Sequence, residues 1–520
     1  MRKAVMRWCG GRPRRHVPPV SDRSSAAGEH DEREPALLRS LGPIPLIAIG
    51  IGAIIGAGIF VVTGHAAANY AGPGVVVSFA LAGLGCLFAG LCYAEYASMI
   101  PVAGSAYTYT YAALGRFCAW IIGWNLVLEY LVSAAAVATG WSGYFIALIN
   151  RLGVPLPTAL AAAPVTVQAG DFVATGAMFN LPAAMLVGIL TVVLVFGARL
   201  SASFNNAMVA IKLAIVLLVI IVGLPYVVPD NHVPLIPANN GTFGEFGWSG
   251  VLRATGVIFF AYIGFDAVSV LAQEARNPQR NVPIGILGSL LICTVLYMLM
   301  AYVLTGIAPY GSLNVPNPVS MALTHASPTV HWLAPIINAG AVVGLASVVL
   351  VLLLAQSRIF YAMSRDGLIP ELFHRIHPRF HTPHLGTIVT GLISALLAGL
   401  LPFEIMGELV SIGTLTAFAF VCTGVLVLRV KVPDVHRPFR TPAVWIVAPL
   451  GTAMCVLMMA FLPLDTWLRL IVWTGAGLLI YFLYGVRHAR PPRWSISAKP
   501  APHAQTRQRL PTGVRPSTAE

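Results

Sequence analysis

Long apolar runs recur along almost the whole chain, and this feature restricts its fold more than any other. A membrane-spanning helix needs about 20 predominantly apolar residues. Only 10% of the residues are charged, whereas a soluble domain carries about 25%. The sequence therefore predicts an all-α polytopic membrane protein with twelve transmembrane helices. Their windows are 44–64, 74–99, 117–149, 181–198, 206–228, 251–272, 285–308, 332–362, 386–402, 407–429, 443–463 and 466–486.

The basic residues predict the orientation of these helices. An even number of crossings places both termini on one side, and that side holds 28 of the 32 Lys and Arg residues. By the positive-inside rule, we expect both termini to be cytoplasmic and the protein to lie in the inner (plasma) membrane. The net charge of +13 then reflects topology, so nucleic-acid binding is not expected. The seven cysteines stand singly, which predicts no metal site, and no motif indicates a cofactor or an enzyme.

Two of the predicted helices carry glycines where a helix should be continuous. The stretch "GIGAIIGAGIF" at 50–60 has four glycines within nine residues, although each costs about 0.5–1 kcal/mol relative to alanine in a helix interior. The stretch "TGVIFFAYIGFDAVSVLAQE" at 255–274 has Gly264 at its middle. We expect both helices to be interrupted, the first at Gly56-Ala57-Gly58. The alternative is that "GAIIG" permits close helix packing.

The interrupted helices are the first and the sixth, and an offset of five predicts two five-helix repeats of opposite orientation. In that arrangement, broken helices meet at the middle of the bilayer and form a transport site. Freed N–H groups at Ile59 and Phe60 suit a carboxylate, and freed carbonyls near Ala261 and Tyr262 suit an ammonium group. Such a site fits an α-amino acid. The paired breaks favour transport over packing alone.

Three ionisable residues fall inside the apolar runs. Asp266 follows Gly264, where it fits either an N-terminal cap of the second half-helix or a direct substrate contact. Glu129 fits a proton acceptor, a pocket acid or a hydrogen-bonded partner within the bundle. A charged Lys212 costs about 2.5–3.5 kcal/mol in the bilayer core, a cost that loss of its proton removes. Its position favours proton exchange over a side chain that snorkels to the interface.

Six motifs resemble the amino acid–polyamine–organocation (APC) superfamily, and within it the bacterial permeases that are similar to cationic amino acid transporters. The resemblance extends over about residues 37–488. It rests on "GIGAIIGAGIFVVTG", "CYAEYASMIPVAGSAYTYTYAALG", "GWNLVLEYLVSAAAVATGWSGY", "SFNNAMVAIKLAIV", "FFAYIGFDAVSVLAQEARNPQRNVPIGI" and "SRIFYAMSRDGLIP". It implies a LeuT-like fold with a five-plus-five inverted repeat and alternating access. Lys212 resembles the lysine that replaces a sodium ion beside the first broken helix in proton-coupled members.

The resemblance also implies a set of pocket residues: Gly56, Ala57, Gly58, Glu129, Ser133, Phe260, Ile263 and Asp266, with the Phe260 ring as a gate. We include Ile55, Ile59, Ala261 and Leu352 as their neighbours, and Lys212 as the proton-coupling residue. Two positions depart from the family pattern. Ala57 replaces a frequent threonine, which affects the substrate ranking. Gln273 replaces one acid of a frequent acidic pair and leaves only Glu274, which affects the cytoplasmic gate.

Four regions follow: a disordered cytoplasmic tail at 1–40, a transporter core at 41–430, the last two helices at 431–488 and a second cytoplasmic tail at 489–520. We expect proton-coupled symport of small to medium neutral L-amino acids, with protons and the lipid bilayer as partners. A facilitator or exchanger of cationic amino acids is the alternative, and an amino acid sensor a remote one. Glu95 fits either an inner-gate acid or a partner of a loop arginine. The oligomeric state is not predicted.

Overall fold

The computed structural model describes residues 41–100, 105–168, 171–197, 202–270, 275–380 and 382–490. The N-terminal tail at 1–40, the C-terminal tail from 491, and Gln273 and Glu274 lie outside the described residues. What was predicted for them therefore remains a prediction.

Helices make up most of the described chain, and each of the twelve predicted windows contains at least one. The helices are α2 (Pro43–Ile54), α3 (Thr63–Ala66), α4 (Val75–Met99), α5 (Ser105–Leu114), α6 (Arg116–Arg151), α7 (Leu181–Val195), α8 (Ala202–Gly223), α9 (Gly247–Ile258), α10 (Ala267–Val270), α11 (Pro278–Ile307), α12 (Pro318–Ala326), α13 (Leu333–Arg365), α14 (His384–Leu400), α15 (Phe403–Lys431), α16 (Val444–Ala460), α17 (Leu464–Ile480) and α18 (Val486–His488). Further helices, such as α5 and α12, lie between the windows. Within these described residues, seven helical segments are long and apolar enough to cross a membrane. Four shorter apolar helices, α2, α7, α14 and α16, accompany them.

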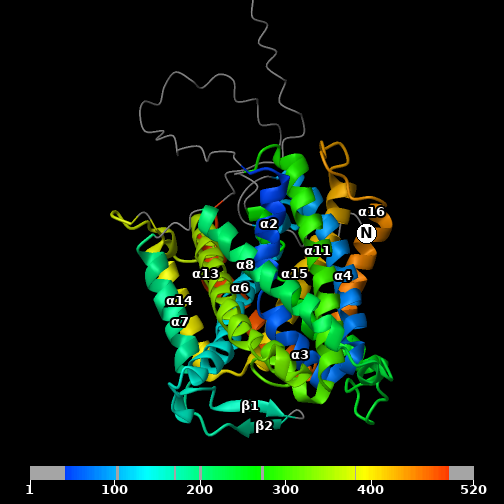
Figure 1. The fold of residues 1–520 in the computed structure, drawn as a ribbon. Helices are drawn as coiled ribbons and strands as arrows, with labels where there is room; N and C mark the ends of the chain where they lie inside the picture. Colours follow the sequence, from blue (N-terminus) through cyan, green and yellow to red (C-terminus); the bar gives the residue numbers. More distant parts are fainter. Residues whose placement is uncertain are drawn as a thin grey trace, which may run out of the picture.

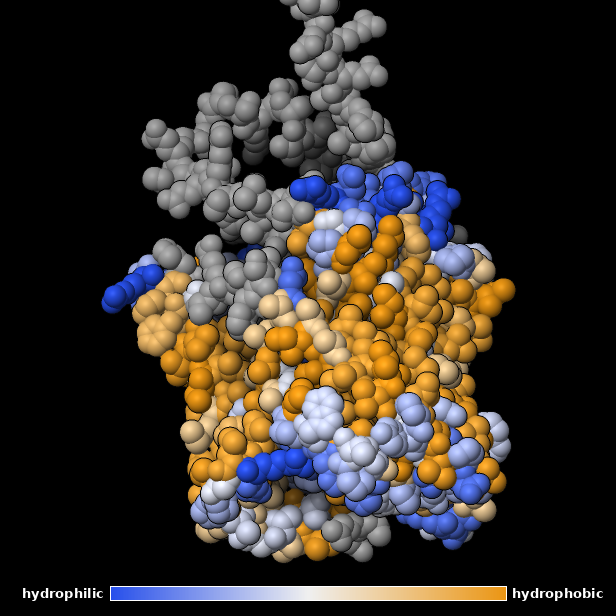
Figure 2. All heavy atoms as spheres, viewed as in Figure 1, coloured by the Kyte–Doolittle hydropathy of each residue, from blue (hydrophilic) through white to orange (hydrophobic). Residues whose placement is uncertain are grey.

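The surface has the polarity that a bilayer requires. On the face that Figure 2 shows, an apolar band lies between two more polar ends. Large apolar side chains on the outer helices are largely exposed, among them Leu392 of α14, Trp445 of α16 and Val472 of α17. Such a surface is stable in lipid and would associate in water. The chain is therefore a polytopic helical membrane protein.

The bundle is organised around two long helix pairs. Helix α6 packs along α13 and also contacts α15, while α11 packs against α4 and α2. Helices α7 and α14 lie side by side at one edge of the bundle (Figure 1). Most of α6 is buried, so its side chains face other helices rather than lipid.

One element departs from the all-helical prediction. Strands β1 (Val165–Gln168) and β2 (Asp171–Ala174) form an antiparallel hairpin, in which Val165 pairs with Ala174 and Val167 with Phe172. The hairpin lies below the bundle (Figure 1). Valine and threonine favour strands, but four residues are too few to appear in a search for membrane spans.

The last long helix is fastened to the third predicted crossing by indole hydrogen bonds. Trp120 donates to the Gly477 carbonyl at 2.9 Å, and Trp124 donates to the Trp473 carbonyl at 2.8 Å. The Trp473 indole donates back to the Trp124 carbonyl at 3.2 Å, and these two rings stack with centroids 4.6 Å apart. Gly477 allows the approach, because a Cβ there would lie 2.4 Å from the Trp124 ring. Helix α17 is thus bonded to α6 as well as packed on it.

Candidate functional site

The first predicted helix is broken where its glycines predict. Helix α2 ends at Ile54, and Ile55 has an extended backbone with ψ 101°. A π-helical turn then begins at Gly58 and leads into α3. In the described structure, no hydrogen bond to a backbone carbonyl is found for the N–H groups of Gly58 or Ile59, whereas the Phe60 N–H donates to the Gly56 carbonyl at 3.4 Å. The prediction of a free N–H was wrong for Phe60. The break therefore presents the N–H donors of Gly58 and Ile59 inside the bundle.

The sixth predicted helix is broken in a corresponding way. Helix α9 ends at Ile258, a 3₁₀ turn occupies Phe259–Tyr262, and Ile263 is extended with ψ 135°. Gly264 follows with φ +116°, a backbone conformation that L side chains rarely adopt. The chain becomes helical again at Ala267.

Glycines bring the two breaks into contact. A Cβ on Gly58 would lie 2.3 Å from Cβ of Ala261, and a Cβ on Gly264 would lie 2.7 Å from the carbonyl oxygen of Ala53. The packing interpretation holds for the other two glycines of the first helix. A Cβ on Gly50 would meet Ser289, and one on Gly52 would meet Val209. Helix interruption and close packing thus coexist in one helix.

A tyrosine that the sequence analysis missed joins the two breaks. The Tyr297 hydroxyl of α11 lies 2.8 Å from the carbonyl oxygen of Ile54 and 2.7 Å from that of Ala261. Its side chain is fully buried against Phe79 and Tyr262. Carbonyls freed by both breaks therefore share one hydroxyl partner. Its only signal in the sequence was a polar atom within an apolar run.

A small cavity of about 20 Å³ lies between the two breaks. One water molecule needs roughly 10–15 Å³ on this measure, so this conformation is occluded and does not hold an amino acid. Its described lining is Ala53, Ile54, Gly56, Ala57, Gly58, Ser133, Val137, Phe260, Ile263, Val348 and Leu352. Ser133 supplies the side-chain hydroxyl of this lining, and its Oγ has no hydrogen-bond partner among the described residues.

Seven of the predicted pocket residues line the small cavity: Gly56, Ala57, Gly58, Ser133, Phe260, Ile263 and Leu352. Ile55, Ile59 and Ala261 are buried beside it but do not line it. Ala53, Ile54, Val137 and Val348 line it and were not predicted. Val137 lies one helical turn beyond Ser133 on α6, so helical spacing could have identified it.

The two predicted acids lie outside the lining of the small cavity. Glu129 is one helical turn before Ser133 and 1% exposed, and neither of its carboxylate oxygens has a hydrogen-bond partner among the described residues. The Thr414 hydroxyl and the Asp266 carboxylate lie near enough to interact with Glu129 electrostatically. Asp266 accepts a hydrogen bond from the Tyr130 hydroxyl. The two acids therefore form a buried polar group beside the site.

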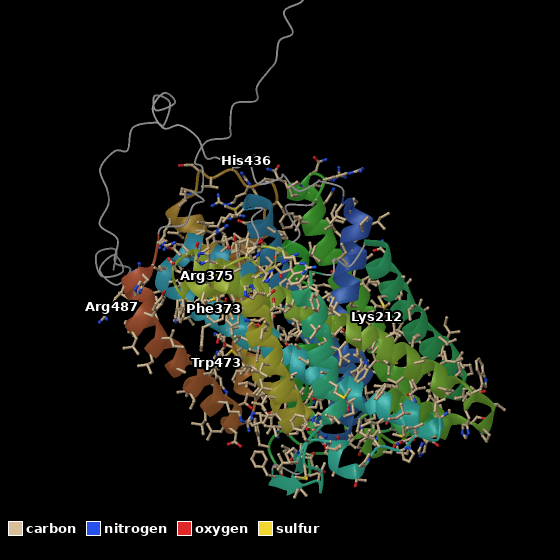
Figure 3. All side chains as sticks on the ribbon, turned by 90° about the vertical axis from the view of Figure 1, so that its left-hand side faces the viewer. Lys212, Phe373, Arg375, His436, Trp473 and Arg487 are labelled. Carbon is tan, nitrogen blue, oxygen red and sulfur yellow. The ribbon has the colours of Figure 1, made fainter. Side chains whose placement is uncertain are left out.

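Lys212 does not snorkel, which corrects the alternative interpretation of this residue. Its side chain is 2% exposed, and its Nζ donates to the Gly52 carbonyl at 2.8 Å. The residue lies next to α2 (Figure 3). Gly344 of α13 makes room for its stem, because a Cβ there would lie 2.9 Å from Lys212 Cγ. Lys212 thus connects α8 to the half-helix that ends at the first break.

A larger cavity of about 520 Å³ lies beside β1, and Phe403 lines it. The Phe403 ring meets the Phe260 ring edge to face, with centroids 5.8 Å apart and an interplanar angle of 85°. Phe260 lines the small cavity. This aromatic pair therefore stands between the two cavities.

The opposite end of the bundle, which carries His436 (Figure 3), is closed by charged and aromatic contacts. Glu95 accepts hydrogen bonds from Arg429 at 2.9 and 2.8 Å and from the Thr441 N–H at 2.8 Å. Arg437 lies 3.3 Å from the same carboxylate. Of the two interpretations of Glu95, the structure supports the partner of a loop arginine.

A second polar contact at this end joins α5 to the end of α13. The Tyr107 hydroxyl donates to Asp366 Oδ2 at 2.7 Å. Burial raises the pKa of Asp366 above its ordinary range, although the Tyr107 hydroxyl and the Arg365 charge both lower it.

Broken helices, a buried site between them and separate closures on either side define a membrane transport protein. A family model described as "Amino acid permease" matches residues 41–484. The chain belongs to this amino acid permease family, which confirms the superfamily that the sequence motifs predict.

Several relatives match three quarters or more of the chain. The methylthioribose transporter of Bacillus subtilis is 45% identical over 87% of this chain and 95% of its own length. The branched-chain amino acid permease BcaP of the same organism is 46% identical over 88% of this chain and 95% of its own. A vacuolar cationic amino acid transporter of Arabidopsis thaliana is 38% identical over 76% of this chain and 64% of its own.

Proposed function

We propose that this protein takes up neutral amino acids with branched or medium apolar side chains, by proton-coupled alternating access. The observation that carries the proposal is the small cavity, which Gly58 lines with the Ile59 N–H beside it, and in which apolar side chains form most of the remaining wall. Such donors suit the substrate carboxylate. The permease relative named for branched-chain amino acids is consistent with this wall.

The lining argues against the two other substrate classes. No carboxylate lines the small cavity in the described part of the chain, so in this conformation a cationic side chain would have no counter-charge in direct contact with it. A relative is named for methylthioribose, a sugar whose hydroxyl groups need hydrogen-bond partners. In the described lining, Ser133 is the residue with a side-chain hydroxyl. Methylthioribose remains the second candidate because that relative is 45% identical.

The proposed architecture has twelve crossings, two inverted five-helix repeats in a LeuT-like arrangement, and both termini in the cytoplasm of a plasma-membrane protein. The breaks in the first and sixth windows and the basic residues of the tails support it. The hairpin end is then extracellular. Labelling of single cysteines in intact cells tests the orientation: one at exposed Phe172 of the hairpin should react with an impermeant maleimide, and one at Lys431 should not.

In the proposed mechanism, Lys212 couples a proton to opening. A protonated Lys212 makes a charge-assisted hydrogen bond to the Gly52 carbonyl, which is stronger than the bond from a neutral amine. That bond holds the inner half of the first broken helix against α8. Loss of the proton to the cytoplasm weakens it, so the inner half-helix can move away and release the substrate.

The test is uptake of labelled leucine, arginine and methylthioribose into proteoliposomes, with and without an inward proton gradient. We expect leucine to accumulate only with the gradient. Lys212→Met should still exchange leucine across the membrane but no longer accumulate it. The control is Lys431→Met, an exposed lysine at the end of α15, which should behave as wild type.

Two results would contradict the proposal. Gradient-independent equilibration of arginine, with Lys212→Met equal to wild type, would establish a facilitator of cationic amino acids. Uptake of methylthioribose without leucine would establish the second substrate class.

A further inference from the structure

The larger cavity differs from the small one in size and in chemistry. At about 520 Å³, it falls in the range of about 300–1,000 Å³ that is usual for small-molecule sites. It is built by α3, α6, the β1 region, the segment 314–317 and the start of α15. In this conformation, the larger cavity is therefore large enough for an amino acid, whereas the small cavity is too small for one.

The charge of the lining is the feature that selects a ligand. Glu404 supplies a carboxylate, and within the described lining there is no Lys or Arg to neutralise it. The lining also includes four residues with amide side chains, Asn150, Asn180, Asn314 and Asn317. A cavity of this kind attracts an ammonium group and disfavours a ligand whose charge is only negative.

Glu404 is placed to act on a ligand. It lies in the first turn of α15, where the helix dipole stabilises a negative charge. Its side chain is 21% exposed, and His65 Nδ1 lies 3.9 Å from its Oε1, a pair that is ionic only when the imidazole is protonated. This distance is longer than a hydrogen bond, so the Glu404 carboxylate can still accept a hydrogen bond from the ammonium group of a ligand. Phe403, the preceding residue, packs against Phe260, so the carboxylate stands directly beside the aromatic closure of the small cavity.

We propose that the large cavity is a recognition site in which Glu404 binds the ammonium group of the substrate before the Phe260–Phe403 contact opens. This inference deepens the proposed function and rests on amino acids being the substrate. The site discriminates by the amine. It favours amino acids and amines over carboxylic acids and uncharged sugars, whereas the small cavity discriminates by the side chain.

The experiment uses the full chain in proteoliposomes and two variants. Glu404→Gln removes the carboxylate, and the matched control Asp465→Asn removes an exposed carboxylate of α17, which does not line the cavity. Leucine uptake is measured over a concentration range, with isoamylamine and 4-methylpentanoate as competitors. Isoamylamine carries the ammonium group of leucine without its carboxylate, and 4-methylpentanoate carries the carboxylate without the ammonium group.

We expect Glu404→Gln to raise the KM for leucine and the inhibition constant of isoamylamine about tenfold, which corresponds to roughly 1.4 kcal/mol. Inhibition by 4-methylpentanoate should change little, and Asp465→Asn should match wild type. Equal effects of Glu404→Gln and Asp465→Asn would overturn the inference, because they would show that uptake depends on the total negative charge of the surface rather than on a carboxylate in the cavity. An unchanged constant for isoamylamine would overturn it as well.

A direct binding measurement separates this inference from the proposed function. Isoamylamine binding to the purified wild-type chain and to Glu404→Gln is measured by calorimetry in detergent. If no amino acid is transported, the proposed function fails, yet weaker amine binding in Glu404→Gln would still support the site. If leucine is transported but both chains bind the amine alike, the recognition site fails and the proposed function stands.

Discussion

Tyr297→Phe is the substitution whose effect follows most directly from the structure. It removes one oxygen atom and leaves the ring in its packing against Phe79 and Tyr262. The lost hydroxyl donates toward two carbonyls, of Ile54 at the first break and of Ala261 at the second. A buried hydrogen bond contributes about 1 kcal/mol net. The hydroxyl has one proton, so the two carbonyls share a single donor. Its removal leaves buried carbonyl oxygens without that donor, and an unsatisfied buried acceptor costs about 1–3 kcal/mol. We therefore expect a loss of about 2 kcal/mol in the free energy of unfolding.

The assay is equilibrium unfolding by sodium dodecyl sulfate in mixed micelles, together with leucine uptake in proteoliposomes. If the closed conformation lies on the limiting step, 2 kcal/mol lowers the uptake rate by up to about thirtyfold. The control is Tyr96→Phe. That hydroxyl is buried without a hydrogen-bond partner among the described residues, so its removal should leave the stability unchanged or higher.

The reasoning is refuted if Tyr297→Phe and Tyr96→Phe have the same stability within about 0.5 kcal/mol, a difference typical of neutral surface substitutions. It is also refuted if Tyr297→Phe loses stability but transports as wild type. In that case the hydroxyl supports the fold without holding the two breaks in the transport cycle.

Three further predictions follow from single contacts. Gly264→Ala should abolish uptake, because φ +116° and an approach of 2.7 Å to the Ala53 carbonyl leave no room for a methyl group; Gly188→Ala of α7, with open space around its Cβ position, should transport as wild type. Glu95→Gln should lower the free energy of unfolding by about 3–5 kcal/mol, as expected for a broken buried ion pair, whereas Glu371→Gln, in an exposed pair with Arg490, should cost less than about 1 kcal/mol. Because the pKa of Asp366 is raised in the folded chain, the folded state holds this proton more tightly than the unfolded state, so this group's contribution to stability falls as pH rises from its ordinary range through the raised pKa. Unfolding measured across that window should show a smaller decrease for Asp366→Asn than for wild type.

The positions of the breaks could be predicted because their cause is local. Glycine is the residue that accepts φ +116°, so Gly264 marks the interruption without knowledge of its neighbours. The apolar windows likewise needed only length and composition. Helix ends were less accurate: the window 407–429 became α15, which runs from Phe403 to Lys431. The charged Glu404 in the first turn of α15 lies outside that window, because an apolar window does not extend over it.

The contacts that close the site depend on residues far apart in sequence. Tyr297 reaches the Ile54 carbonyl across a separation of 243 residues, and Arg429 reaches Glu95 across 334. No local pattern records such a pairing. The side chains of Glu129 and Asp266 illustrate the same limit. The resemblance predicts them in the pocket, and in this conformation they are outside the described lining of the small cavity, where Asp266 accepts from the Tyr130 hydroxyl; their role in substrate binding stays a prediction.

The indole hydrogen bonds between α6 and α17 have a consequence for the order in which this protein is made. Trp120 and Trp124 are synthesised roughly 350 residues before their carbonyl partners at Gly477 and Trp473. At about 5–20 residues per second, the ribosome needs roughly 20–70 s to close that interval. Throughout it, two indole donors of the helix that carries Ser133 lack their final partners. Helix α6, the third predicted crossing to be synthesised, therefore gains these hydrogen bonds only after α17 has been synthesised. In a nascent chain that stops before α17, the two indole N–H groups of α6 lack these acceptors.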